Sequence, residues 1–133
     1  MKVRLTALLA IVGLISVLPA LAHHSFAAEF DETKPLAITG VVSKVEWGNP
    51  HVYFYVDVKD DKQNTVTWGV ESASVGELVH RGWQRDTLKV GDHVKVEGFT
   101  AKDGSHLMDA RRIYLNGKPI FGGSEGDGGP GGQ

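Results

Sequence analysis

The residues of this sequence best suited to chemistry are two adjacent histidines, His23 and His24. They directly follow Ala20-Leu21-Ala22, the small-x-small pattern at which a signal peptidase cleaves. Cleavage after Ala22 would give His23 a free α-amine, whose pKa of about 7.7–8 makes deprotonation by a metal easy. Amine and imidazole nitrogens suit Cu(II), so we expect a copper site at the mature N-terminus.

Completing a three-nitrogen histidine brace requires one further imidazole. His24 and His51 are our candidates for it, and His93 and His106 are also available. The thirteen residues of 23–35 would reach almost any face of the domain when extended at about 3.3–3.6 Å each, so reach excludes no donor. The alternative is that His23 and His24 are simply a solvated chain start, which is common at chain ends.

A second candidate site lies between Trp47 and Tyr55. The segment Trp47-Gly48-Asn49-Pro50-His51 has the composition of a turn, and the alternating segment after it places His51, Tyr53 and Tyr55 on one face. Trp47, Asn49, Tyr53 and Tyr55 are therefore candidate ligand-binding residues. The alternative is that the tyrosines close a second small core against the segment before the first strand.

The first 22 residues predict export. Lys2 and Arg4 precede an uncharged apolar run over 5–18, and Pro19 ends it before the cleavage pattern. The run is shorter than the roughly 20 residues of a membrane span. We therefore expect a cleaved signal peptide over 1–22, a periplasmic or secreted mature protein, and no membrane span after cleavage.

Composition narrows the classes of function. The signal segment takes with it two basic and no acidic residues, so the mature chain holds 12 basic and 16 acidic residues, a net charge of −4. From this acidic balance we predict that nucleic acid is not a partner, because its binding requires clustered Lys and Arg. The chain has no cysteine, which excludes thiolate chemistry. No nucleophile motif is present, so we predict no catalytic residues and favour a protein that is not an enzyme.

The elements after residue 35 follow a simple order. Strands are predicted over 36–47, 51–58 and 65–70, a short helix begins after Ser74, and further strands cover 93–99 and 107–115. Gly40 marks an expected bulge in the first strand, and Gly82 the end of the helix. Three strands, a helix and two strands are the order of an OB-fold. We thus predict an all-β, OB-like five-stranded barrel with one short helix between strands 3 and 4.

The domain boundaries follow from these elements. We predict an N-terminal lead-in over 23–35, the barrel over 36–121 and a glycine-rich tail over 122–133 that cannot bury a core.

The motifs Ala22-His23-His24-Ser25-Phe26, Trp47-Gly48-Asn49-Pro50-His51 and Leu88-Lys89-Val90-Gly91-Asp92 resemble those of a family of small secreted bacterial proteins with a domain of unknown function. The resemblance covers about residues 22–121. It implies export and a single β-rich domain, and it implies no activity. The positions that match its motifs include His23, His24, Trp47, Asn49 and His51.

Three hypotheses remain open. The first is an exported periplasmic binding module that holds copper through His23, with His24 or His51. The second is a metal-free OB-type adaptor for a small ligand or another periplasmic protein, using the Tyr53 and Tyr55 face. The third is a small metalloenzyme built on the first site.

Overall fold

The computed structural model describes residues 26–122. After a helical turn over residues 26–29, the elements are β1 (Phe30–Glu46), β2 (Tyr53–Lys59), β3 (Thr65–Glu71), α2 (Val75–His80), β4 (His93–Ala101), β5 (Leu107–Leu115) and β6 (Lys118–Phe121). The predicted signal peptide and His23 and His24 lie outside the described residues, as does the tail after Gly122. No helix within 26–122 has the length and apolar character needed to cross a membrane.

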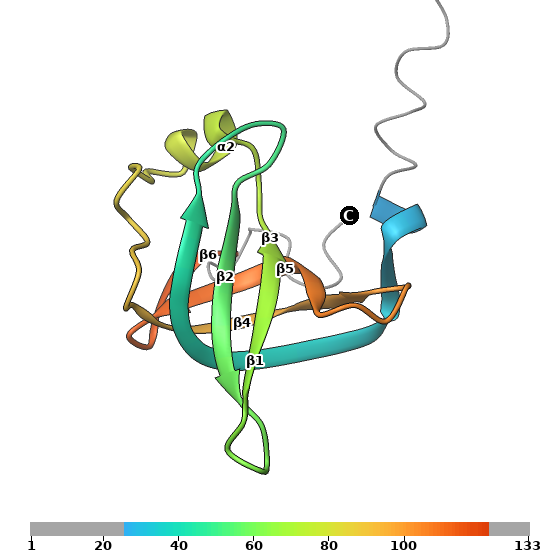
Figure 1. Ribbon diagram of the computed structural model, residues 1–133. Helices are drawn as coiled ribbons and strands as arrows, with labels where there is room; N and C mark the ends of the chain where they lie inside the picture. The colour runs from blue at the N-terminus through green and yellow to red at the C-terminus, as the bar shows by residue number, and fades with distance from the viewer. Residues whose placement is uncertain (1–25, 123–133) are drawn as a thin grey trace, which may run out of the picture.

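Five of the strands close into a barrel. The sheet order is β3-β2-β1-β4-β5-β6, and β3 also pairs with β5, in parallel. The β3–β5 pairing joins the ends of the sheet over Gly69–Glu71 and Leu107–Asp109, which shortens the edge that each strand leaves open. The short helix α2 lies between β3 and β4 in the chain and sits across one end of the barrel (Figure 1). The prediction of an all-β, OB-like barrel is confirmed.

The first strand is long and sharply bent, and each half pairs with a different neighbour (Figure 1). It pairs with β4 up to Val41 and with β2 from Val41 onward. We expected the bulge at Gly40, but the register shifts between Val42 and Lys44. Gly40 has another role, because a Cβ there would lie 2.2 Å from the carbonyl oxygen of Asp57. The glycine therefore lets β1 and β2 approach closely.

The start of β1 lies earlier than the strand predicted from Leu36. Phe30 pairs with Ala101 of β4 and is 2% exposed. The pairing is irregular between Phe30 and Pro35, which is why sequence pattern alone did not reveal a strand there. The last part of the predicted lead-in thus belongs to the barrel.

The core fills the barrel with side chains of alternating strand positions. Val52, Phe54 and Val56 are buried, as the period-2 pattern of the second strand predicted. Met108 is fully buried in the same core cluster, where its flexible side chain fills space between the branched residues. Trp83, from the segment between α2 and β4, is buried in the core and donates its indole N–H to the carbonyl of Ile120 at 2.7 Å.

Helix α2 begins and ends as the sequence predicted, with one correction. The Ser74 hydroxyl accepts from the amide of Glu77 at 3.2 Å, and Gly82 follows the helix with φ +91°. The apolar positions Val75, Leu78 and Val79 predict a common side that faces the core. Leu78 is fully buried, but Val79 is 54% exposed, so that prediction is wrong for Val79. A six-residue helix that caps a barrel end turns only one narrow stripe inward.

Candidate functional site

A buried carboxylate, Glu71, joins two of the residues singled out in the sequence. Its Oε1 lies 2.6 Å from His51 Nδ1, and its Oε2 accepts the hydroxyl hydrogen of Tyr53 at 2.6 Å. Glu71 is 7% exposed, whereas the His51 side chain is 41% exposed. Burial, followed by the bond to Glu71, raises the pKa of the Tyr53 phenol. The imidazole is thus fixed at one nitrogen while part of its ring remains open to solvent.

The strand register explains why these three side chains meet. Tyr53 and Glu71 are direct partners in the antiparallel β2–β3 pair. His51 precedes Tyr53 by two residues and so projects on the same side. The segment is held in place by Val52, whose N–H donates to Ala73 O at 2.8 Å and whose carbonyl accepts from Ser72. Backbone hydrogen bonds between these segments therefore determine where the side chains of the site lie.

The seam between β3 and β5 brings a second carboxylate to the same place. Asp109 is the cross-strand partner of Glu71. Burial raises the pKa of Asp109 to about 6, against the opposing effect of Arg111 and with a further increase from the negative charge of Glu71. Arg111 Nε lies 2.9 Å from Asp109 Oδ2. Both of these atoms are buried, whereas charged pairs on strand faces are ordinarily solvated.

The described chain begins beside this cluster. The ring of Phe26 lies 4.5 Å from the guanidinium carbon of Arg111, and the ring of Phe99 lies 5.4 Å from it. In the same turn, the pKa of Glu29 is raised by burial and then by the charges of Glu71 and Asp103. The N-terminal turn is thus electrostatically coupled to the His51–Glu71 pair.

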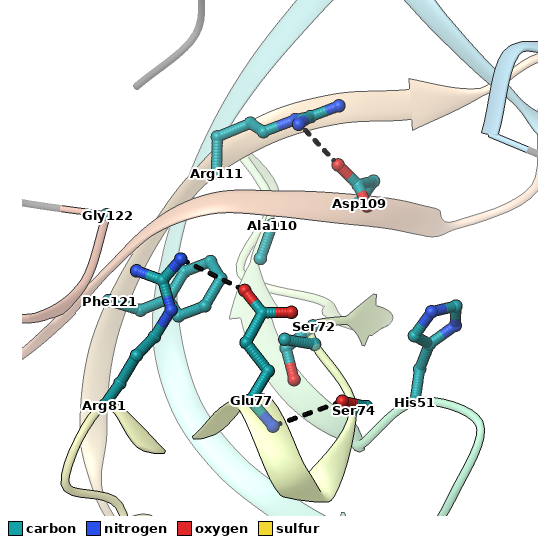
Figure 2. A pocket seen from close by; sticks show the side chains of 11 residues that line it. His51, Ser72, Ser74, Glu77, Arg81, Asp109, Ala110, Arg111, Phe121 and Gly122 are labelled. Atoms are coloured by element: carbon teal, nitrogen blue, oxygen red, sulfur yellow. Dashed lines mark hydrogen bonds and ion pairs between the residues drawn. The ribbon is translucent and has the colours of Figure 1, made fainter. Parts of the chain in front are cut away.

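A cavity of about 340 Å³ opens next to these residues (Figure 2). Asp109 and Arg111 of β5 line one side of it, and Glu77 and Arg81 lie on the side of α2. His51 is also among the lining residues. The volume is at the lower end of the range of small-molecule sites, about 300–1,000 Å³.

The remaining predicted site residues take other positions. The Asn49 side-chain oxygen accepts from the amide of Val75 at 3.1 Å and so ties its loop to the start of α2. Trp47 is partly buried against the core. The Tyr55 hydroxyl lies 3.4 Å from Glu46 Oε2, and its ring lies under the Lys44 ammonium at 5.4 Å. The structure therefore brings His51 and Tyr53 together and leaves Tyr55 and Asn49 apart from them.

Glu71 and Asp109 are the two site residues that sequence reasoning missed. Each is an acid at an outward position of a strand whose inward neighbours, Val70 and Met108, are fully buried. The signal that could have found them is the barrel order itself, because closure of an OB-type barrel sets the third strand beside the fifth.

The raised pKa of Asp109 predicts how stability depends on pH. The folded protein binds this proton more tightly than the unfolded chain, so the free energy of unfolding should fall as pH rises from about 4 to about 6. The fall from this one group should be about 1–3 kcal/mol. Asp109→Asn should remove that component, which urea unfolding at pH 4, 5, 6 and 7 would measure. The same slope in both proteins would show that Asp109 does not titrate in this window.

Comparison with solved structures gives likenesses of fold at low identity. A mitochondrial single-stranded DNA binding protein from S. cerevisiae, Rim1, aligns with TM-score 0.48 and 12% identity over 62% of this chain and 92% of that one. The N-terminal domain of PriB from Thermoanaerobacter tencongensis aligns with TM-score 0.45 and 18% identity over 62% and 96%. Yeast Stn1 and Ten1 give TM-score 0.40 and 13% identity over 61% and 42%.

These likenesses correct one prediction and leave the function open. Our exclusion of nucleic acid as a partner was wrong, because one structure of similar fold is itself a single-stranded DNA binding protein. No curated protein matches the chain. A family of unknown function, DUF6152, matches residues 12–108 and agrees with the resemblance seen in the sequence motifs. The chain belongs to this family.

Proposed function

We propose that the protein is an exported periplasmic module that binds one Cu(II) ion through the mature N-terminal residue His23. The α-amine and imidazole of His23 would supply two nitrogens, and His51 would supply the third, with His24 as the alternative donor. A site made of amine and imidazole nitrogens binds Cu(II) more tightly than it binds other first-row divalent metals.

The contact between His51 and Glu71 is the observation that carries this proposal. A histidine that binds a metal through one ring nitrogen usually gives the other to a carboxylate, which fixes the ring and raises its basicity. His51 Nδ1 lies 2.6 Å from Glu71 Oε1, and the imidazole is 41% exposed while the carboxylate is buried. The ring is therefore held in the way a metal ligand requires, with its Nε2 as the nitrogen left for a metal.

The rest of the donor set has to come from elsewhere in the chain. Within residues 26–122 no three His, Asp or Glu side chains group as they would around a metal ion. The first described residue is Phe26, whose ring contacts the Arg111 guanidinium. Arg111 and His51 line the same cavity. Three residues span at most about 10 Å, so a chain starting at His23 has its end within about 10 Å of Phe26. A bound copper ion would add Lewis-acid and redox capacity to this cavity.

A substitution of the supporting carboxylate tests the proposal. Glu71→Gln keeps the size of the side chain but removes the charge that orients His51, and such changes typically weaken metal binding by about 10–100-fold. Cu(II) competition titrations of exported protein, with mass spectrometry confirming the start at His23, would measure the loss. Glu46→Gln is the matched control, because Glu46 contacts Tyr55 on the same strand surface and lies outside the cavity.

Two outcomes decide the test. Weaker binding in Glu71→Gln alone, with a metal-free melting temperature close to that of the parent, would support the role of the His51–Glu71 pair. Equal loss in both variants, or in neither, would contradict it.

The metal-free adaptor is supported less well. It needs the Tyr53 and Tyr55 face for stacking, but the Tyr53 hydroxyl is engaged by Glu71, and Tyr55 lies against Glu46 and Lys44. If protein that starts at His23 bound Cu(II) no more tightly than protein with extra residues before His23, this adaptor would become the working hypothesis. Loss of partner binding on Tyr55→Ala would then be its test.

A further inference from the structure

Tyr53 makes the second of two short contacts to the buried carboxylate of Glu71. Its hydroxyl lies 2.6 Å from Glu71 Oε2, and His51 Nδ1 lies 2.6 Å from Oε1 of the same carboxylate. Glu71 is buried, so its oxygens depend on protein groups rather than on bulk water for hydrogen bonds. The three side chains therefore form one chain of polar contacts, from Tyr53 through Glu71 to His51.

The hydrogens in this chain can point in only one direction. An ionised carboxylate only accepts hydrogen bonds, and a tyrosine hydroxyl, whose ordinary pKa is about 10, keeps its proton at neutral pH and can donate. Two lone pairs facing each other across 2.6 Å would repel, so a hydrogen has to lie between His51 and Glu71. That hydrogen belongs to Nδ1, which leaves the lone pair of a neutral His51 on Nε2.

The position of Tyr53 suits it to holding Glu71 in this orientation. The two residues are direct partners in the antiparallel β2–β3 pair, so backbone pairing brings the phenol beside the carboxylate. On its other side Glu71 faces Asp109, its partner in β5, whose negative charge repels that of Glu71. The Tyr53 hydroxyl thus supplies Oε2 with the hydrogen bond that an ionised Asp109 could not give.

We propose that Tyr53 is a positioning residue for His51. Its hydroxyl holds Glu71 so that the imidazole carries its hydrogen on Nδ1 and leaves Nε2 free to bind a metal ion. This role deepens the proposed copper site and rests on the proposed function, but the tautomer of His51 is a property of the metal-free protein. Groups that hold a metal-binding histidine in place raise its affinity for the metal. Tyr53 acts one contact further from the metal, through Glu71.

The first test is Tyr53→Phe in exported, metal-free protein, with EDTA present. The 15N shifts of the His51 ring, at a pH where the imidazole is neutral, report which nitrogen carries the hydrogen, and His51→Ala assigns the signals. In the parent we expect the Nδ1–H form in about 10-fold excess or more, the effect of a hydrogen bond to a charged group. Tyr53→Phe should reduce that excess by about 3–10-fold.

Tyr55→Phe is the matched control for this substitution. Tyr55 lies two residues further along β2, and its hydroxyl also contacts a glutamate, but that glutamate is Glu46 at 3.4 Å. The same hydroxyl group is removed from the same face of the strand, and the contacts of Glu71 are left in place. The tautomer of His51 should therefore stay as it is in the parent.

Glu71→Gln gives a second and sharper result, because an amide donates on one side and accepts on the other. With Tyr53 donating to the amide oxygen, the NH2 group faces His51 Nδ1, which then has to accept. We expect the ring hydrogen to move to Nε2 in Glu71→Gln. Adding Tyr53→Phe should turn this reversal into a mixture of tautomers, because the hydroxyl that selects the orientation of the amide is gone.

The tautomers decide the inference. A smaller Nδ1–H excess in Tyr53→Phe, with no change in Tyr55→Phe, supports it. An unchanged excess in Tyr53→Phe, an equal change in both variants, or a parent with its hydrogen on Nε2 overturns it. If Tyr53→Phe fails to fold, as its amide spectrum would show, Glu71→Gln decides: reversal supports the inference, and retention of Nδ1–H overturns it.

Copper titration of the same proteins separates this inference from the proposed function. Tyr53→Phe should weaken Cu(II) binding by about 3–10-fold, less than the 10–100-fold loss expected in Glu71→Gln, and Tyr55→Phe should leave it unchanged. A parent that shows the expected tautomers but binds no Cu(II) would defeat only the proposed function. Tight Cu(II) binding by the parent, with the same tautomers and the same affinity in Tyr53→Phe, would defeat only this inference.

Discussion

Adding Gly-Pro in front of His23 is expected to weaken Cu(II) binding by at least about 100-fold, or about 2.7 kcal/mol. The extension converts the α-amine of His23 into a peptide nitrogen and so removes one of three proposed donors. Proline is included for a chemical reason. A free chain end with histidine in third place can bind Cu(II) through deprotonated amide nitrogens, and proline has no N–H to lose. Competition titration against a chelator of known affinity measures the difference.

Two controls separate the amine from the rest of the site. His51→Ala in the unextended protein should also weaken binding, because it removes the third nitrogen. His80→Ala should leave it unchanged, since His80 ends α2 and is not among the residues that line the cavity. Equal affinity with and without the Gly-Pro extension would exclude the α-amine from the copper site.

The second large effect is expected from Gly98→Ala in β4. A Cβ at Gly98 would lie 1.8 Å from the carbonyl oxygen of Asp109 and 2.9 Å from its carbonyl carbon. Both are backbone atoms, so no side-chain rotation can relieve the overlap, and β4 and β5 would have to move apart. We expect the free energy of unfolding to fall by at least about 3 kcal/mol, the upper end for overpacked sites. Urea unfolding measures this loss.

Gly76→Ala is the matched control for that substitution. Gly76 lies inside α2, and nothing lies within 4 Å of a Cβ placed there. Alanine is the better helix former, so this change should raise the free energy of unfolding by about 0.5–1 kcal/mol. If Gly98→Ala were as harmless as Gly76→Ala, the close approach of β4 to Asp109 would not exist in solution.

The sequence predicted the barrel better than it predicted the site. Two local signals are found in the structure. One is the alternation of Val52, Phe54 and Val56, and the other is the helix cap at Ser74. Our prediction placed the bulge at Gly40, which was wrong. The apolar pattern shows that the inward-facing positions of the strand switch from one alternation to the other, but not at which residue they do so. The bulge falls between Val42 and Lys44, where the strand has to bend toward β2.

The candidate site depends on long-range pairing, which explains what the sequence left out. His51 and Tyr53 were singled out together because they share a face of one strand. Glu71 and Asp109 join them only through register between strands far apart in the chain, and no local pattern encodes that register. His23 and His24 lie outside the described residues, so their part in the site stays a prediction.

The seam that closes the barrel has a consequence for local opening. β3 and β5 pair over three residue pairs, from Gly69 with Leu107 to Glu71 with Asp109. So short a parallel ladder is a natural place for the barrel to open without unfolding as a whole. Two carboxylates of the site lie at its last rung. A ligand that bridges Glu71 and Asp109 would therefore stabilise the β3–β5 pairing against opening. It would slow hydrogen exchange at these two strands before it affected any other strand.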